Sequence, residues 1–263
     1  SRGIQRPLQQ QYFQKFPAIE RSDNLCHRTR MTGCRYSATP SDEDLDFDTQ
    51  TTVTMVGSQV ALVAVASLIA YLIGTPNYGL GPDIDFGIES ILQGALMALP
   101  LGIIAWLLDL VEKQVPALQD VTKATQRSVL ALLGGSFKPL VGLMTAIGLG
   151  VAAGLGEEML FRGVLQYEIG NRLFFAAGEG SSLAGVVIAS MIFGLLHAVT
   201  ALYAVLASLA SLYFGWLYLD SGNLAVPITT HAVYDVAALL HAHWMVTRLS
   251  RSEQVSLAKW GDE

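Results

Sequence analysis

The stretch VTMVGSQVALVAVASLIAYLI, residues 53–73, contains 21 residues and no charged side chain. A helix rises 1.5 Å per residue, so this length covers the roughly 30 Å hydrocarbon core of a bilayer. Because the bilayer core offers backbone groups no hydrogen-bonding partner, an apolar segment of this length is expected to cross it as a helix. The stretch therefore predicts an all-α membrane protein.

The composition of the 263-residue chain agrees with this prediction. Hydrophobic residues make up 52% and charged residues 14%, whereas soluble domains carry about 25% charged residues. The net charge is −6, with seven Arg or Lys residues in 1–36 and five acidic residues in 42–48. No basic face remains for nucleic acid. Both cysteines, Cys26 and Cys34, lie in the basic leader, which excludes disulfides, thiolate metal sites and cysteine nucleophiles from the hydrophobic body.

Five further apolar segments follow the first. They cover about residues 86–108, 139–155, 182–196, 200–219 and 224–246. Pro100 is expected to kink the first of these, and a polar amphipathic stretch occupies 112–138. The sequence thus predicts a polytopic membrane helix bundle of about six transmembrane spans with interfacial amphipathic helices. Six spans place the N-terminus, the 112–138 stretch and the C-terminal tail on one side, which the positive charges of the last two also favour.

We expect three regions along the chain. Residues 1–50 form a basic-then-acidic leader, 51–247 the membrane domain, and 248–263 a polar tail. The leader is either a disordered tail or, over about residues 1–37, an organelle transit peptide; alternatively, Met31 starts a shorter product. The chain is predicted to be a multi-pass integral membrane protein. If the leader is a plastid transit peptide, the membrane is the thylakoid or the envelope of the plastid; otherwise it is that of the endoplasmic reticulum.

Ionisable side chains within the apolar segments are candidates for function, because they are costly in hydrocarbon. Four groups qualify: Glu157 with Glu158 and Arg162; His197; His231 with Asp235; and Glu89 with Gln93. His241 and His243, beside Trp244, are interpreted as residues of the membrane interface.

The stretch GLGEEMLFRGVLQ, residues 154–166, separates two roles if it continues the preceding helix. Residues four apart share a helix face, so Glu158 is expected to pair with Arg162. Glu157 lies about 100° away round the helix and is left without a local cation, which suits a general base. The alternative is that all three residues mark a helix end at the membrane interface.

The two histidine groups point to the same chemistry. His197 follows Phe193 by one turn, and a lone histidine on an apolar helix face is more often a satisfied core residue than a catalyst. His231 and Asp235 are four apart, the spacing of a carboxylate that orients an imidazole. Because three segments each contribute an acid or an imidazole, we expect these side chains to converge in a water-accessible cavity. One carboxylate and two imidazoles around water are suited to hydrolysis.

The ordered motifs EExxxR (residues 157–162), FxxxH (193–197) and Hxxx followed by Asp (231–235) resemble the CPBP intramembrane proteases. That family includes the Rce1-type CAAX prenyl endopeptidases and the bacterial Abi proteins. The resemblance covers about residues 139–246.

The resemblance implies an intramembrane endopeptidase that uses no metal and no cofactor. Glu157 would activate water with help from His197, while His231 and Asp235 would stabilise the oxyanion. Glu158 and Arg162 would form a structural ion pair, and Phe193 would support the site. The implied substrate is a membrane-tethered protein or peptide, with no role for nucleic acid.

One position departs from the pattern of the prenyl endopeptidases, which have Asn where this chain has Asp235. An ionised carboxylate would repel an oxyanion, so either Asp235 is protonated or it orients His231 and leaves that imidazole as the donor. A zinc site is a weaker alternative: Glu157, His197, His231 and Asp235 are possible ligands, but the chain has no HExxH motif.

Two other classes of function compete with the endopeptidase. The first is a non-catalytic assembly or regulatory factor that binds other membrane proteins or pigments, for example in the photosynthetic membrane of a plastid. The second is a transporter in which Glu89 and Gln93 line a polar pathway, although no inverted repeat supports it.

Overall fold

The first long helix, α2 (Thr49–Ile73), contains the apolar stretch quoted above. The computed structural model describes residues 45, 47–173 and 180–260, so the predicted leader and its transit peptide lie almost entirely outside the described residues. Asp48 caps the helix, since its carboxylate accepts hydrogen bonds from the backbone N–H groups of Gln50 and Thr51. These bonds and that of the Thr51 hydroxyl hold the pKa of Asp48 below its ordinary value.

Helices make up all the regular structure within the described ranges, which confirms the all-α membrane bundle. After α2 the long helices are α3 (Ile88–Val111), α4 (Pro116–Leu133), α5 (Pro139–Glu158), α6 (Gly180–Leu196), α7 (Ala201–Ser221), α8 (Ala225–Val246) and α9 (Arg251–Lys259). The short helices are η2 (Pro76–Gly79) and η3 (Glu112–Gln114), and two π-helical segments, η4 (Met159–Gln166) and η5 (Ile169–Leu173), follow α5.

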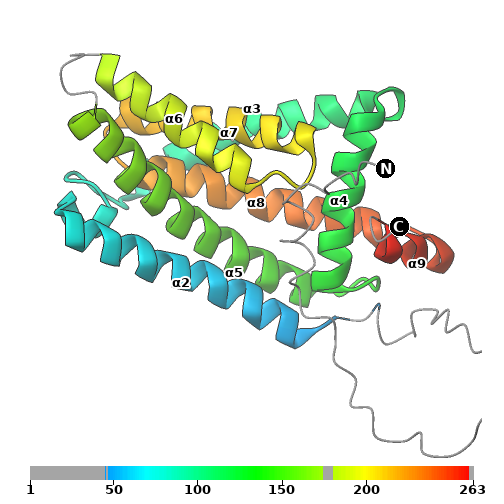
Figure 1. Cartoon of the computed structure of the whole chain (residues 1–263). Coiled ribbons are helices and arrows are strands. Elements are labelled where there is room, and N and C mark those ends of the chain that lie inside the picture. Colours follow the sequence, from blue (N-terminus) through cyan, green and yellow to red (C-terminus); the bar gives the residue numbers. More distant parts are fainter. Residues whose placement is uncertain (1–44, 46, 174–179, 261–263) are drawn as a thin grey trace, which may run out of the picture. The chain divides into compact units, whose positions relative to one another are not determined.

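Each of the six predicted apolar segments is helical, but not all of them are long and apolar enough to cross a membrane. Four stretches among the described residues are long and apolar enough to cross a membrane: Thr49–Ile73, Ile88–Gln114, Pro139–Arg172 and Ala201–Ser221. Helix α6 is shorter. Helix α8 has 22 residues, but its histidines and Asp235 lower its hydropathy. Because α8 packs against α3, α5 and α7, protein rather than lipid surrounds much of it (Figure 1).

The third predicted segment is longer than expected. We expected an apolar helix over 139–155, whereas the helical stretch continues through η4 and η5 to Arg172. Glu157 and Glu158 therefore lie inside a continuous helical segment and are buried. The structure does not place them at a helix end, because the helical stretch continues past them, and Glu158 contacts Arg162 of the same stretch and His231 of α8.

Small residues allow α5 and α8 to approach closely. A Cβ atom added to Gly150 would lie 2.9 Å from the carbonyl oxygen of Ala232, and one added to Gly154 would lie 2.8 Å from that of Ile228. The GxxxG pattern at these two glycines therefore serves backbone contact between the helices. This close contact brings the glutamates at the end of α5 beside the first turns of α8.

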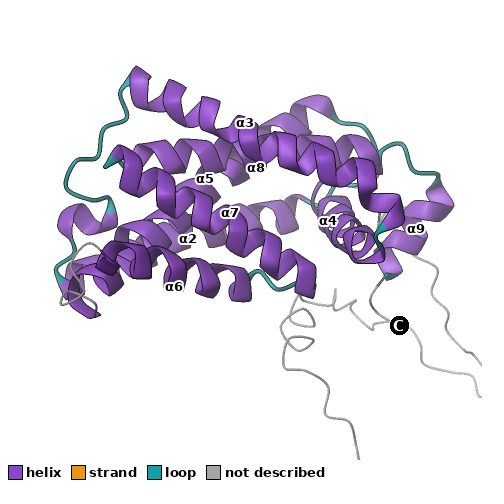
Figure 2. Ribbon diagram, turned by 90° about the horizontal axis from the view of Figure 1, so that it is seen from above, coloured by secondary structure: helices purple, strands orange, loops and turns teal. Residues whose placement is uncertain are grey.

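The polar segments gather at one end of the bundle (Figures 1 and 2). The Thr52 hydroxyl in α2 donates to the carbonyl oxygen of Leu132 in α4 at 3.2 Å. Gln254 in α9 donates to the carbonyl oxygen of Gly135 at 3.0 Å. The start of the membrane domain, the 112–138 stretch and the C-terminal tail thus lie together, as the sequence predicted, and the tail contains the helix α9.

Candidate active site

Three helices bring their ionisable side chains to one place. Glu157 comes from α5, His197 follows the end of α6, and His231 and Asp235 lie on α8. The Glu157 Oε2 atom is 3.7 Å from His197 Nε2 and 4.0 Å from His231 Nε2. The structure thus brings together the four residues for which the sequence suggested catalytic roles.

Arg162 lies at the closed side of this site and is fully enclosed. Its Nη1 atom is 2.9 Å from Glu158 Oε1, and its Nη2 atom donates to both the backbone oxygen and the hydroxyl of Ser211 at 2.8 and 2.7 Å. The guanidinium carbon lies 5.3 Å from the ring centroid of Phe193 and 5.4 Å from that of Phe214. A buried cation needs such partners to offset its desolvation.

Glu158 has a second partner that the sequence did not predict. Its Oε1 atom also accepts a hydrogen bond from His231 Nδ1 at 2.8 Å. Because a carboxylate can only accept a hydrogen bond, the Nδ1 atom must carry the proton. The other ring nitrogen, Nε2, faces Glu157 and Asp235. The ring of Phe214 stacks on His231 with centroids 4.8 Å apart and an interplanar angle of 14°. Glu158 and Phe214 together fix the orientation of this imidazole.

His197 is oriented by its own helix. Its Nδ1 atom lies 2.8 Å from the carbonyl oxygen of Phe193, which can only accept, so Nδ1 donates. The Phe193 ring stacks on the imidazole at 4.1 Å. In the neutral ring the Nε2 lone pair then faces the carboxylate of Glu157 at 3.7 Å. Two acceptors at this distance can share a water molecule that donates a hydrogen bond to each.

Exposure differs sharply across the site. The side chains of His197 and Asp235 are 31% and 30% exposed, whereas those of Glu157 and His231 are 9% and 7% exposed. Glu158 and Arg162 are inaccessible. The site therefore opens past His197 and Asp235 and is sealed behind Glu158.

The other polar candidates lie elsewhere. Glu89 is exposed in the first turn of α3 and takes no part in the cluster, nor does Gln93. His241 is exposed, with its Nδ1 atom 4.0 Å from Asp109 Oδ2. His243 is buried against the ring of Phe137. The two histidines face different surroundings because residues two apart lie about 200° apart round a helix. His241 is thus exposed and His243 is enclosed by protein, and the interpretation of the two as interfacial residues stays a prediction.

Sequence reasoning missed two residues of α7, Ser211 and Phe214. Ser211 is fully buried and binds Arg162, while Phe214 stacks on His231. Residues three apart share a helix face, so the sequence does show a serine and an aromatic residue on one face of an apolar helix. This spacing does not by itself indicate a contact with the site. Many apolar helices carry that spacing without any polar partner.

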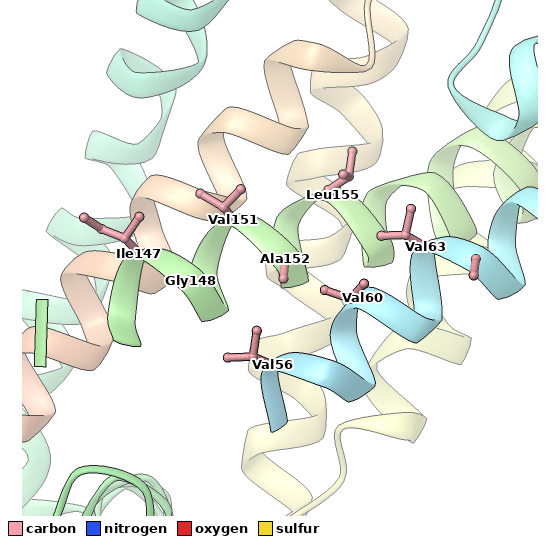
Figure 3. A pocket seen from close by; sticks show the side chains of 9 residues that line it. Val56, Val60, Val63, Ile147, Gly148, Val151, Ala152 and Leu155 are labelled. Atoms are coloured by element: carbon pink, nitrogen blue, oxygen red, sulfur yellow. The ribbon is translucent and has the colours of Figure 1, made fainter. Parts of the chain in front are cut away.

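An apolar groove of about 600 Å³ lies between α2 and α5 and does not belong to the site (Figure 3). Its wall consists of Val56, Val60, Val63, Ala64, Ile147, Gly148, Val151, Ala152 and Leu155. Leu155 and Glu157 are two positions apart, about 200° round the helix. The groove and Glu157 therefore lie on opposite sides of α5.

Fold and site together define a membrane helix bundle with a carboxylate and two imidazoles at its polar centre. Residues 139–237 match the family described as type II CAAX prenyl endopeptidase Rce1-like. The matching segment extends from the start of α5 to just beyond Asp235, and it contains the three motifs that resemble the CAAX proteases. No curated protein and no solved structure matches the chain.

Proposed function

We propose that the chain is an intramembrane endopeptidase in which Glu157 activates the attacking water. The observation that carries the proposal is the position of Glu157 Oε2, which lies within 4.0 Å of an imidazole nitrogen on each of two other helical elements. A carboxylate held between two imidazoles, in a site open at one side, supplies a base, an assisting base and an electrophilic donor.

The reaction would proceed in two proton-balanced steps. Water between Glu157 and His197 loses a proton to the Glu157 carboxylate as its oxygen attacks the peptide carbonyl carbon. The resulting tetrahedral oxyanion is stabilised by a hydrogen bond from His231 Nε2. When the C–N bond breaks, the proton held by Glu157 passes to the leaving amine, and the new carboxylic acid then loses its own proton to solvent.

The substrate class follows from where the site lies. Its helices present large apolar side chains on their outer surfaces, as expected of helices in lipid, and the site opens beside His197 and Asp235. A peptide tethered to the membrane would reach this opening by diffusion within the bilayer. Since the matching family is described as CAAX prenyl endopeptidase, a prenylated C-terminal peptide is the first substrate to test.

The test is cleavage by the purified full chain in lipid nanodiscs, with mass spectrometry of the products. The substrates are a prenylated C-terminal peptide and a set of membrane-tethered peptides. Glu157→Gln removes the base with almost no change in volume and is expected to lower the cleavage rate by about 10²–10⁴-fold. Glu89→Gln, an exposed glutamate outside the cluster, is the matched control and should cleave normally. Equal rates for the two variants would refute the proposal.

A further inference from the structure

We propose that Asp235 is a positioning residue that acts through His231. Together with Glu158 it holds the imidazole in its doubly protonated form, so that Nε2 carries a proton to donate to the oxyanion. The catalytic consequence rests on the proposed endopeptidase function, whereas the protonation of His231 does not.

The geometry places a carboxylate at each nitrogen of the ring. Nδ1 lies 2.8 Å from Glu158 Oε1, and Nε2 lies 3.5 Å from Asp235 Oδ2. A neutral imidazole has a single N–H, and here that N–H is directed at Glu158. The Nε2 atom of a neutral His231 would have no proton to donate. Donation from Nε2 therefore requires the imidazolium.

The proton between His231 and Asp235 belongs on the ring for two reasons. The hydrogen bond from Nδ1 to the Glu158 carboxylate makes the imidazole more basic. The Asp235 Oδ2 atom faces Nε2, and a carboxylate beside a ring nitrogen favours a proton on that nitrogen. The alternative, a protonated Asp235 beside a neutral imidazole, loses both effects.

The charges around His231 favour a cation as well. The three carboxylates of Glu157, Glu158 and Asp235 against the one guanidinium of Arg162 leave a net charge of −2, which a cationic His231 reduces to −1. The imidazole lies beside carboxylates and rings of four helices: Glu157 and Glu158 of α5, Phe193 of α6, Phe214 of α7 and Asp235 of α8. The next charged or titratable groups are Arg162, which contacts Glu158, and His197, which contacts Glu157.

This arrangement accounts for an aspartate where the prenyl endopeptidases have an asparagine. The 3.5 Å contact of Asp235 with Nε2 is long for a hydrogen bond. The Nε2 proton is therefore weakly engaged at rest and remains available to an oxyanion that forms beside it. Asparagine would donate its own hydrogen bond, whereas aspartate supplies the donor indirectly by keeping a proton on the histidine.

The test is the protonation state of His231 in the full-length chain, read from the ¹⁵N shifts of labelled histidines in nanodiscs between pH 5.5 and 9, as an experimental range. His231→Gln assigns the signal. Both nitrogens of His231 should be protonated at pH 7.5, and Asp235→Asn should lower the midpoint of its titration by at least about one pH unit. Asp109→Asn is the matched control, since Asp109 is the exposed neighbour of His241 at 4.0 Å, and it should leave the His231 midpoint unchanged.

A neutral His231 at pH 7.5 in the wild-type chain, or the same midpoint in Asp235→Asn, would overturn the inference. The cleavage assay supplies a second readout. If the chain cleaves a tethered peptide, the alkaline limb of its pH profile should move down in Asp235→Asn together with the His231 midpoint. If no peptide is cleaved while the midpoint still moves, the proposed function fails and the role of Asp235 toward His231 stands.

Discussion

Replacing Arg162 with methionine should destabilise the bundle far more than the same change at Arg172. Arg162→Met keeps a long unbranched side chain but removes the cation beside Glu158 and both hydrogen bonds to Ser211. Removing one partner of a buried ion pair costs about 3–5 kcal/mol, because the other charge stays buried without compensation. For a domain of 150–250 residues this corresponds to a fall in Tm of roughly 6–20 °C.

Arg172 provides the control within the same helical segment. It also pairs with a glutamate four residues earlier, Glu168, but its side chain is 58% exposed. An exposed pair contributes about 0–1 kcal/mol, so Arg172→Met should lower the Tm by at most about 4 °C. The assay is thermal unfolding in detergent micelles, followed by tryptophan fluorescence. If Arg162→Met lowers the Tm by no more than Arg172→Met does, Arg162 is not the buried centre of the bundle.

Two further predictions concern helix contact and helix capping. Gly154→Val should separate α5 from α8 and abolish both the cooperative thermal transition and cleavage, because any Cβ there meets the carbonyl oxygen of Ile228. Gly148 has open space around it, so Gly148→Val should leave both unchanged. Equal behaviour of the two variants would contradict this packing. In the capping box of α9, hydrogen bonds from Ser250 lower the pKa of Glu253. A lowered carboxyl pKa stabilises the folded state above the unfolded value and ceases to do so as the pH falls through the folded value. Hydrogen exchange of the α9 amides, corrected for the intrinsic rate, should therefore show protection that is greater at pH 7 than below about pH 4; protection independent of pH would refute this capping role.

The membrane bundle was predictable because lipid imposes a simple rule on composition. A segment such as residues 53–73 must be apolar on every side, so its length alone indicates a spanning helix. The rule worked less well for α8, which is helical as predicted but surrounded largely by protein. There the neighbouring helices satisfy the polar side chains, and hydropathy no longer measures whether the helix crosses a membrane.

The sequence predicted which polar side chains converge, but an individual contact between two of them was predictable only where the partners are close in sequence. The spacing of four between Glu158 and Arg162 gave the ion pair, which the structure shows at 2.9 Å. The hydrogen bond from His231 to Glu158 joins residues 73 positions apart, and nothing in either local pattern indicates it. Such a contact depends on the register of α5 against α8, which the glycines of α5 permit and the local sequence does not encode.

The central claim is that Glu157 performs chemistry rather than holding the bundle together. Complementation of a strain lacking the gene tests this most directly, with Glu157→Ala compared with Glu89→Ala at equal membrane abundance. The account predicts that Glu89→Ala restores the phenotype and that Glu157→Ala does not. Full rescue by Glu157→Ala would contradict the account and would favour a non-catalytic membrane factor that retains the family motifs.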